Sequence, residues 1–557
     1  MDDVTITTVS HIQARWVLEI LDDVATWARM SFKASKSRSM IIKKGKVTNK
    51  FCLKIQEEII PSIEEKPVKC LGKWFDASLK DGNNINDAVQ QAEDWLKKIE
   101  KSDLSGKFKV WLYQHGLLPR LVWLFTIYEF PITTVELIER KVSKSLRRWL
   151  GVPPGFTSVG LYMQSGQLQL PISSAVEEYK VAKCRNLLCL RDSEDKSIRQ
   201  SGIVTRSGRK WAADKAVEQA ENALKLRDII GIPCIGRQGF GSIPFQQWSG
   251  ASKKTKQAMI QSEVRSQEEE RRRAKAVGQG SQGAWTKWDL PSRKLTWEEL
   301  WRWEPLRISF LLRSVYDTLP SPSHLHMWGV KEDPNCKLCG QRGTLAHILT
   351  GCKTSLSQGR YTWRHDKVLL ALAHMIEQVR TKNTQARGNP GRWIEFVPQG
   401  SKPASAKARS KPHLLQKAQD WELRVDVGKR LKFPDIVTST LRPDIVLWSE
   451  KGKKIIMIEL TVPWEEGCEE AHERKALKYQ PLLQECRDKG WQAWLFPVEV
   501  GCRGFPAKSV WQLMAALGLP NRDKRKTARR LSEEAERASS WIWHRREEAH
   551  WRFSADG

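Results

Sequence analysis

The sequence predicts a multidomain α+β protein in which the N-terminal two-thirds is mostly helical and the C-terminal part is an α/β domain. Three observations predict this fold class. The chain has 557 residues, and a single hydrophobic core rarely grows beyond roughly 250–300 residues. Apolar residues recur at helical spacing through residues 84–230, whereas β-rich runs alternate with helix-like stretches through 420–515. Between these regions, three cysteines and one histidine stand at the spacing of a small metal site.

Changes in composition and periodicity divide the chain into successive segments. Short β-like runs around one helix-like stretch come first and are typical of part of an α/β domain. A helical region follows, in which Val110, Leu117, Leu121 and Leu124 would share one face. The predicted boundaries are 1–80 for the opening segment, 81–230 for the helical region, 231–300 for a charged connector, 301–384 for a helical region with the metal cluster, 385–415 for a basic linker, 416–515 for the α/β domain and 516–557 for a charged helical tail.

The charge balance favours a polyanionic partner. Lys and Arg number 93 against 64 Asp and Glu, which gives a formal net charge of +29. Such a surplus favours nucleic acid over an anionic membrane; the alternative is that the cations form solvated faces only. We find no apolar run near the roughly 18 residues of a spanning helix, no signal-peptide pattern and no sign of a small-molecule substrate. We therefore expect DNA or RNA as partner, no membrane association and no secretion.

A Cys-x2-Cys-x7-His-x4-Cys pattern is the clearest motif, and it consists of Cys336, Cys339, His347 and Cys352. Two thiolates on one tight turn and a His/Cys pair on a following helical turn supply four ligands suited to tetrahedral zinc. A closed set of four ligands leaves no position for water, so this zinc would be structural. The alternative is four unrelated residues in a reduced protein. The pattern predicts a zinc knuckle.

Two β-rich runs in the C-terminal domain, Pro443–Trp448 and Lys454–Thr461, flank a segment of hairpin character. If Lys451-Gly452 forms a two-residue turn, the resulting register places Asp444 opposite Glu459. Like charges at opposed positions destabilise a hairpin unless something neutralises them. Mg²⁺ with these oxygen ligands would do so, and it could activate water for attack on a phosphate, which is nuclease chemistry. The alternative is that one carboxylate faces solvent or pairs with a neighbouring lysine.

The helix-like stretch after the second β-run carries candidate cationic residues. His472, Lys475 and Tyr479 would share one helical face, and Lys478 would lie one turn beyond Lys475. A lysine projecting from this helix could position water or stabilise the pentacovalent transition state of phosphate cleavage. The alternative is a set of ordinary solvated helix cations.

The strings RPDIVLW, IIMIELTVPW and EEAHERKALKY, which contain these residues, resemble the restriction-like endonuclease of certain non-LTR retrotransposons. As in that family, the cysteine cluster stands just ahead of the domain, and Arg364-His365-Asp366 resembles a short Arg-His motif between the two. Restriction-like nucleases share Pro-Asp, a spacer and Asp/Glu-x-Lys, but here Thr461 occupies the lysine position. In the retrotransposon branch the following helix supplies the lysine, so the resemblance implies Lys475 as first choice and Lys478 as second.

The N-terminal segment resembles a reverse transcriptase of the same family. Met1-Asp2-Asp3, the stretch Ala28–Val47 and Leu71-Gly72 resemble the last motifs of its palm, and 81–230 would be its helical thumb. The resemblance implies that Asp2 and Asp3 are two of three carboxylates that bind the polymerase metals. The earlier motifs would lie before Met1, and because two-metal catalysis needs the full carboxylate set, we do not expect polymerisation by this chain alone.

The expected function is that of a truncated non-LTR retrotransposon protein that binds nucleic acid and nicks DNA. Asp444 and Glu459 would bind catalytic Mg²⁺, Lys475 or Lys478 would assist, and the cysteine cluster would hold structural zinc. We expect a nuclear location, with a cytoplasmic one left open. The alternative function is a catalytically inactive nucleic-acid-binding protein, and a third is a polymerase subunit acting in trans. The target site and the template RNA do not follow from the sequence.

Overall fold

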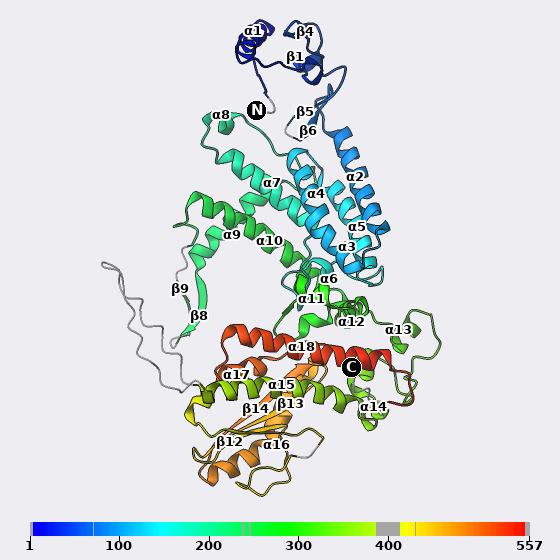
Figure 1. The fold of residues 1–557 in the computed structure, drawn as a ribbon, viewed down its shortest axis with the longest axis vertical. Helices are drawn as coiled ribbons and strands as arrows, with labels where there is room; N and C mark the ends of the chain where they lie inside the picture. Colours follow the sequence, from blue (N-terminus) through cyan, green and yellow to red (C-terminus); the bar gives the residue numbers. More distant parts are fainter. Residues whose placement is uncertain are drawn as a thin grey trace, which may run out of the picture. The chain divides into compact units, whose positions relative to one another are not determined.

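The computed structural model describes residues 4–70, 72–236, 239–243, 247–385, 413–428 and 431–551. Within these residues the protein is mixed α+β, as predicted, and is mainly helical with a five-stranded sheet near its C-terminal end (Figure 1). The chain forms two compact units: unit 1 comprises Met1–Leu146 and Ile172–Glu268, and unit 2 comprises Arg147–Pro171 and Glu269–Gly557. Among the sequence predictions, Asp2, Asp3, Leu71 and most of the 385–415 linker lie outside the described residues. None of the described helices is long and apolar enough to cross a membrane.

Unit 1 begins with a small segment of one helix and three antiparallel hairpins. Ser10 caps the start of the first helix: its side-chain oxygen accepts a hydrogen bond of 3.2 Å from the Gln13 amide, the usual N-cap arrangement. The short β-like runs expected in this segment are present as the strands of these hairpins. The elements are α1 (His11–Trp27), a 3-10 helix (Ala34–Lys36), β1 (Ile41–Lys43), β2 (Lys46–Thr48), β3 (Lys54–Ile55), β4 (Glu58–Ile59), β5 (Val68–Cys70) and β6 (Lys73–Phe75).

Helices make up most of the remainder of unit 1. The predicted apolar face is largely buried, since Val110, Leu117 and Leu121 are at most 3% exposed, whereas Leu124 is half-buried. The elements that lie wholly or mostly in unit 1 are α2 (Gly82–Lys101), α3 (Gly106–Leu112), a π-helical turn (Tyr113–Leu117), α4 (Leu118–Ile127), α5 (Ile132–Trp149), α7 (Ala175–Arg191), α8 (Lys196–Gln200), α9 (Ala213–Ile230), β8 (Ile232–Gly236), β9 (Gly239–Ile243) and α10 (Lys253–Val277). Helix α7 packs on both α4 and α9.

A buried lysine lies on α7. The ammonium of Lys183 donates a hydrogen bond of 2.7 Å to the Tyr128 carbonyl, and the residue is 3% exposed. Burial lowers the pKa of Lys183 to about 8, although the charges of Glu129 and Asp81 act in the opposite direction. Between this value and the ordinary pKa of 10.5, the unfolded chain holds a proton that the folded chain has lost. The free energy of unfolding therefore rises with pH across this window.

We expect Lys183→Met to remove this pH dependence. Relative to the variant, the wild-type chain should gain up to about 3 kcal/mol of stability as the pH rises from 7 to 10, since each pKa unit corresponds to about 1.36 kcal/mol. Denaturant unfolding followed by tryptophan fluorescence at several pH values measures this difference. Lys225→Met, at an exposed position of the neighbouring helix α9, is the matched control and should show no such trend. A stability difference between wild type and Lys183→Met that stays constant with pH would contradict the prediction.

Unit 2 joins helices from several parts of the chain. Its short parallel pairing links β7 (Leu168–Gln169) to β10 (Arg293–Lys294). The carboxylate of Glu536, which is fully buried, pairs with Arg293 at 3.3 Å and with Arg307 at 2.8 Å; two guanidinium groups offset the cost of burying this charge. The helices are α6 (Val159–Tyr162), a 3-10 helix (Gly280–Lys287), α11 (Trp297–Arg302), α12 (Pro305–Val315), α13 (Pro322–Met327), α14 (Lys353–Ser357), α15 (Arg360–Gln385) and α18 (Asn521–His544).

The five-stranded sheet of unit 2 has the order β11-β12-β13-β14-β15. Neighbouring strands are antiparallel except β13 and β14, which are parallel. Parallel neighbours need a crossover connection, and α16 supplies it. The elements are β11 (Glu422–Val425), β12 (Ile445–Ser449), β13 (Lys454–Thr461), α16 (Cys468–Asp488), β14 (Gln492–Gly501), β15 (Phe505–Pro506) and α17 (Lys508–Ala516).

Helices cover both faces of this sheet. On one face, Leu447 and Ile456 belong to a core with residues of α15, α17 and α18; on the other face, Val446 and Met457 pack with residues of α16. Because both faces are covered, consecutive residues of β12 and β13 are buried, and most of them are apolar. Helix α15 precedes the sheet in sequence and α18 follows it, yet both share its core.

Candidate functional site

The cysteine cluster lies in unit 2, between α13 and α14. Cys336 and Cys339 are on a tight turn closed by the Gly340 amide, which donates to the Cys336 carbonyl at 2.8 Å. Gly340 has a φ of +73°, a conformation that glycine adopts without steric cost. His347 begins a π-helical turn (His347–Gly351), and Cys352 follows it directly. The chain therefore has the predicted arrangement of a thiol turn followed by a His/Cys pair.

The four side chains of this cluster converge on one point. One ligand atom from each of Cys336, Cys339, His347 and Cys352 lies within 4.8 Å of all the others, and Cys339 Sγ is 3.1 Å from His347 Nε2. Such separations suit one tetrahedral ion with bonds of about 2.0–2.3 Å. In the part of the chain that the structure describes, this is the one group of three or more ligands of this kind. The cluster could hold a metal ion, and its donors are compatible with zinc.

The local environment shifts the protonation of these ligands. Burial lowers the pKa of His347, which favours the neutral ring that binds metals. Burial raises the pKa of Cys336 to about 11. Burial acts in the same direction on Cys352, but hydrogen bonds from Ser355 and the other thiols outweigh it and lower the Cys352 pKa. A metal ion would bind the thiolates and displace the remaining protons.

Arg364 connects the cysteine cluster to the sheet. Its buried guanidinium on α15 donates to the carbonyl of Leu349, inside the π-helical turn, at 2.8 Å. It also donates to the carbonyl of Val462 at 3.1 Å and to the hydroxyl of Ser539 on α18 at 3.0 Å. Because Val462 follows β13, one side chain fixes the metal-binding segment against the end of the strand that carries Glu459.

The hairpin of β12 and β13 has the register that the sequence predicted. Ile445 lies opposite Ile458, and the turn forms around Lys451-Gly452, closed by a backbone hydrogen bond of 3.2 Å between the flanking residues. One further pair along this register brings Asp444, immediately before β12, opposite Glu459. The prediction that these two carboxylates face each other is therefore correct.

Backbone hydrogen bonds hold the two carboxylates together. The Asp444 amide donates to Glu459 Oε2 at 3.2 Å, and the Leu460 amide donates to Asp444 Oδ2 at 2.7 Å. The side chain of Glu459 is 4% exposed and that of Asp444 is 14% exposed. Burial and, next, the charge of Asp444 raise the pKa of Glu459, while Lys475 acts in the opposite direction. Two acidic groups thus share a largely dry site, which favours a cationic partner.

The two candidate lysines of α16 have different surroundings. The ammonium of Lys475 donates a short hydrogen bond to Glu459 Oε1. The ammonium of Lys478 instead lies 3.2 Å from the hydroxyl of Tyr479 and 4.7 Å from the centre of its ring. The Tyr479 hydroxyl in turn donates to the Arg442 carbonyl at 2.7 Å. Lys475, the first choice from the sequence, is therefore the lysine that directly contacts the carboxylate pair.

A histidine that was not among the predicted site residues also reaches the pair. His365 Nε2 lies 3.3 Å from Asp444 Oδ2 and 3.2 Å from the Leu460 carbonyl, and Nδ1 lies 3.2 Å from Asp366 Oδ1. Burial lowers the pKa of His365, but hydrogen bonds to Asp366 and Asp444 outweigh this effect and raise it to about 10. All three partners are acceptors, so both ring nitrogens carry protons. The Arg364-His365-Asp366 motif was the only sequence signal for this contact.

A second acidic residue on the sheet was also missed. Glu499 on β14 is 2% exposed and accepts hydrogen bonds from Ser509 at 2.6 Å and from His472 Nδ1 at 3.1 Å. Burial raises the pKa of Glu499, although Ser509 and His472 act in the opposite direction. His472, predicted to share a face with Lys475, thus pairs with Glu499. The sequence offered no local signal for this contact, because β14 lies far along the chain.

No model of a known protein family matches the chain, and no curated protein matches its sequence. The chemistry of the two clusters is therefore the basis for assigning a function. The cysteine cluster can hold a metal without an open coordination position, which suits a structural role. The Asp444, Glu459 and Lys475 cluster offers two oxygen ligands for a cation and one fixed positive charge, which suits chemistry on a phosphate.

Proposed function

We propose that this protein binds nucleic acid and nicks DNA with a metal-dependent site formed by Asp444, Glu459 and Lys475. The observation that carries the proposal is the convergence of these side chains from the start of β12, the end of β13 and α16. Phosphodiester cleavage needs groups that bind a cation and groups that stabilise charge on the phosphate. The net charge of +29 supports a polyanionic substrate.

The two carboxylates fit the way in which proteins bind Mg²⁺. This ion usually keeps several waters and takes one or two carboxylates together with phosphate oxygens. Asp444 and Glu459 would hold it, and when bound it would lower the pKa of a coordinated water and neutralise charge on the phosphate. Of the two carboxylates, Asp444 is the more exposed, so the substrate would approach from its side.

The chain's own residues have separate tasks in this proposal. Lys475 opposes the effects of burial and of Asp444, which raise the pKa of Glu459, and it would supply a positive charge close to the phosphate. His365 orients Asp444 through Oδ2. Arg364 holds the end of β13 against α15, so the carboxylate pair has a rigid support, which is what a site needs to hold its groups in productive geometry.

The resemblance to non-LTR retrotransposon proteins supports the wider proposal. In it, residues 1–80 derive from a reverse transcriptase palm, 81–230 from its helical thumb, and 416–515 from the restriction-like endonuclease. The cysteine cluster is a zinc knuckle that helps to hold DNA or RNA near the nuclease site. A nuclear location follows from this proposal, because the DNA to be nicked would be there.

The test uses the full chain and a supercoiled plasmid. With Mg²⁺, the wild-type protein should convert the plasmid to the open circular form, and Glu459→Gln should lower the rate by more than about 100-fold, since even residues that only support a metal ligand contribute 10–100-fold. Glu473→Gln, at an exposed position of α16, is the matched control and should cleave normally. Cleavage by Glu459→Gln at the wild-type rate would show that the assigned site is wrong.

The alternative function is nucleic-acid binding without cleavage. One observation favours it: among the described residues, no third acidic, cysteine or histidine ligand joins Asp444 and Glu459 in a metal-binding group, so Lys475 and Glu459 could be a structural ion pair. In that case the protein would retard DNA in a gel-shift assay but leave supercoiled plasmid intact in Mg²⁺ and in Mn²⁺. Metal-dependent nicking that Glu459→Gln removes would exclude this alternative.

A further inference from the structure

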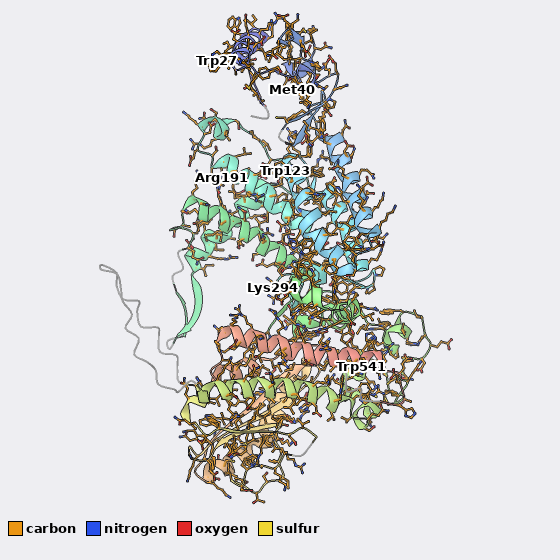
Figure 2. All side chains as sticks on the ribbon, in the orientation of Figure 1. Trp27, Met40, Trp123, Arg191, Lys294 and Trp541 are labelled. Atoms are coloured by element: carbon orange, nitrogen blue, oxygen red, sulfur yellow. The ribbon has the colours of Figure 1, made fainter. Side chains whose placement is uncertain are left out.

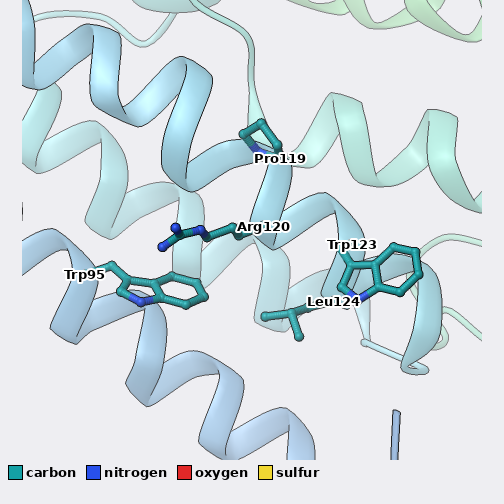
Figure 3. Close-up of a pocket in the computed structure, with 5 residues that line it drawn as sticks. All are labelled: Trp95, Pro119, Arg120, Trp123 and Leu124. Carbon is teal, nitrogen blue, oxygen red and sulfur yellow. The ribbon is translucent and has the colours of Figure 1, made fainter. Parts of the chain in front are cut away.

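A shallow cleft opens between α2 and α4 in unit 1. It is lined by Trp95, Pro119, Arg120, Trp123 and Leu124 and has a volume of about 470 Å³ (Figure 3). Trp123 is 54% exposed, and Arg120 and Pro119 are also exposed. Exposing large aromatic rings forgoes the burial that normally stabilises them. Two indoles on one concave, apolar surface therefore point to a binding site.

Helix α4 and Gly72 place the residues on one side of the cleft. Arg120, Trp123 and Leu124 lie three and four residues apart on α4, so they share one face of that helix. Gly72, just before β6, lies against the Trp123 indole: a Cβ atom added to Gly72 would lie 3.2 Å from this ring, and Gly72 has a φ of +85°. The lack of a side chain at Gly72 therefore leaves room for the indole at this place.

Positive charge is interleaved with the aromatic rings. Figure 3 shows Arg120 reaching toward Trp95, and its guanidinium carbon is 5.6 Å from the centre of that ring. On the adjacent hairpin, the ammonium of Lys69 lies 5.9 Å from the centre of the Trp74 ring, which is 45% exposed. Lys98, one turn beyond Trp95 on α2, is exposed.

The acidic neighbours of Trp95 on α2 already have cationic partners. Glu93 pairs with Lys141 of α5, and Asp94 pairs with Lys97 at 3.6 Å. Arg120 is the charged residue among those that line the cleft. An anionic ligand with a flat apolar part matches this combination of charge and shape.

We propose that this cleft binds an unpaired base of single-stranded nucleic acid, which stacks on the indoles of Trp123 and Trp95 while Arg120 contacts the adjoining phosphate. Stacked bases and backbone cations are the general means of binding single strands. An apolar peptide would use the rings but not the guanidinium, and a duplex keeps its bases out of reach. This inference goes beyond the proposed nicking activity, because it concerns residues of unit 1 and does not depend on Asp444, Glu459 or a metal.

The test compares full-length variants by fluorescence anisotropy with two short labelled oligonucleotides, one with bases and one abasic strand of equal phosphate number. Stacking of one base contributes about 1–3 kcal/mol, so Trp123→Ala should weaken binding of the base-containing strand by about 5- to 150-fold. Binding of the abasic strand should not change. Trp123→Phe keeps an aromatic face and should retain part of the affinity. RNA and DNA versions of the strand distinguish the two sources of the base.

Two controls separate stacking from general damage. Trp27→Ala removes an indole that is 86% exposed at the end of α1 (Figure 2) and should bind both strands as wild type does. Arg120→Ala should weaken both strands and reduce the salt dependence of binding, because it removes a phosphate contact. The proposal is overturned if Trp123→Ala binds as Trp27→Ala does, or if it loses both strands equally.

A direct measurement complements these affinities. Iodouracil in the strand should crosslink on irradiation to the peptides that contain Trp95 or Trp123 in the wild-type chain, and crosslinks confined to other peptides would overturn the proposal. The outcome is separable from that of the nicking assay. If Glu459→Gln loses nicking but still crosslinks normally, the base-binding proposal stands. If the wild-type chain nicks DNA normally but gives no crosslinks to these peptides, the base-binding proposal is refuted and the nicking proposal is not.

Discussion

Replacing Lys475 by alanine is expected to slow Mg²⁺-dependent nicking by about 100- to 1,000-fold, the usual cost of removing one group that stabilises transition-state charge. Replacing Lys478 by alanine should change the rate little. The reason is that Lys475 contacts Glu459, whereas the ammonium of Lys478 lies against Tyr479. Initial rates of conversion of supercoiled plasmid, measured with both variants at equal protein concentration, test this difference.

DNA affinity and thermal stability must be measured for the same two variants. Lys475→Ala leaves the Glu459 charge buried without its partner, which typically destabilises a protein by several kcal/mol. The assay temperature should therefore lie well below the unfolding transition of Lys475→Ala. Equal rate losses in both variants, or a loss in Lys478→Ala alone, would contradict the role assigned to Lys475.

Cys339→Ser is expected to remove one bound zinc ion per chain and to lower the unfolding temperature of unit 2. A structural zinc ion contributes folding free energy directly, about 10–16 kcal/mol in isolated zinc-finger peptides, and part of this should be lost here. The destabilisation should extend beyond the zinc-binding segment, because Ile348 and Leu349, next to His347, pack in a hydrophobic core with Phe310 and Ile542. Metal analysis of the purified chain and thermal unfolding measure the two effects.

Cys189→Ser is the matched control for the zinc prediction. Cys189 is an exposed free cysteine of unit 1, so its replacement should leave both the zinc content and the unfolding temperature unchanged. A strong chelator should reproduce the effect of Cys339→Ser in the wild-type chain. Unchanged zinc content in Cys339→Ser, or a chain that binds no zinc at all, would show that the ligand assignment is wrong.

Features set by local sequence were predicted well. The spacing from Cys336 to Cys352 fixed both the thiol turn and the helical His/Cys pair, because each lies within a short stretch of backbone. The register of the hairpin followed from its turn at Lys451-Gly452, and this register alone places Asp444 opposite Glu459. Once a tight turn is set, strand alternation determines every facing pair.

Contacts between distant segments could not be predicted in the same way. Helical spacing puts Lys475 and Lys478 on neighbouring positions of α16, and only the packing of that helix on the sheet shows which one meets Glu459. His365 reaches Asp444 because α15 covers one face of the sheet. Local patterns of hydrophobicity indicate that a helix has a buried face, but they do not specify its partner.

The tryptophans illustrate a similar limit. Their number was visible in the sequence, but a buried indole and an exposed one have the same local pattern on a helix. Trp285 is buried at 3% exposure, whereas Trp123 is 54% exposed beside Arg120. This difference in exposure depends on which helix faces are covered in the folded chain. Because Trp123 is the exposed one of the two, it is the candidate for contact with a base.

The rate of plasmid nicking by Asp444→Ala, compared with wild type in Mg²⁺ at equal DNA binding, tests the central proposal most directly. The sequence predicted Asp444 as a residue of the site. In the structure it contacts His365 and lies opposite Glu459. The proposed site predicts metal-dependent nicking by the wild-type chain and at least about a 100-fold loss in the variant. Equal nicking by the two proteins would contradict it and would assign any cleavage to residues other than this carboxylate pair.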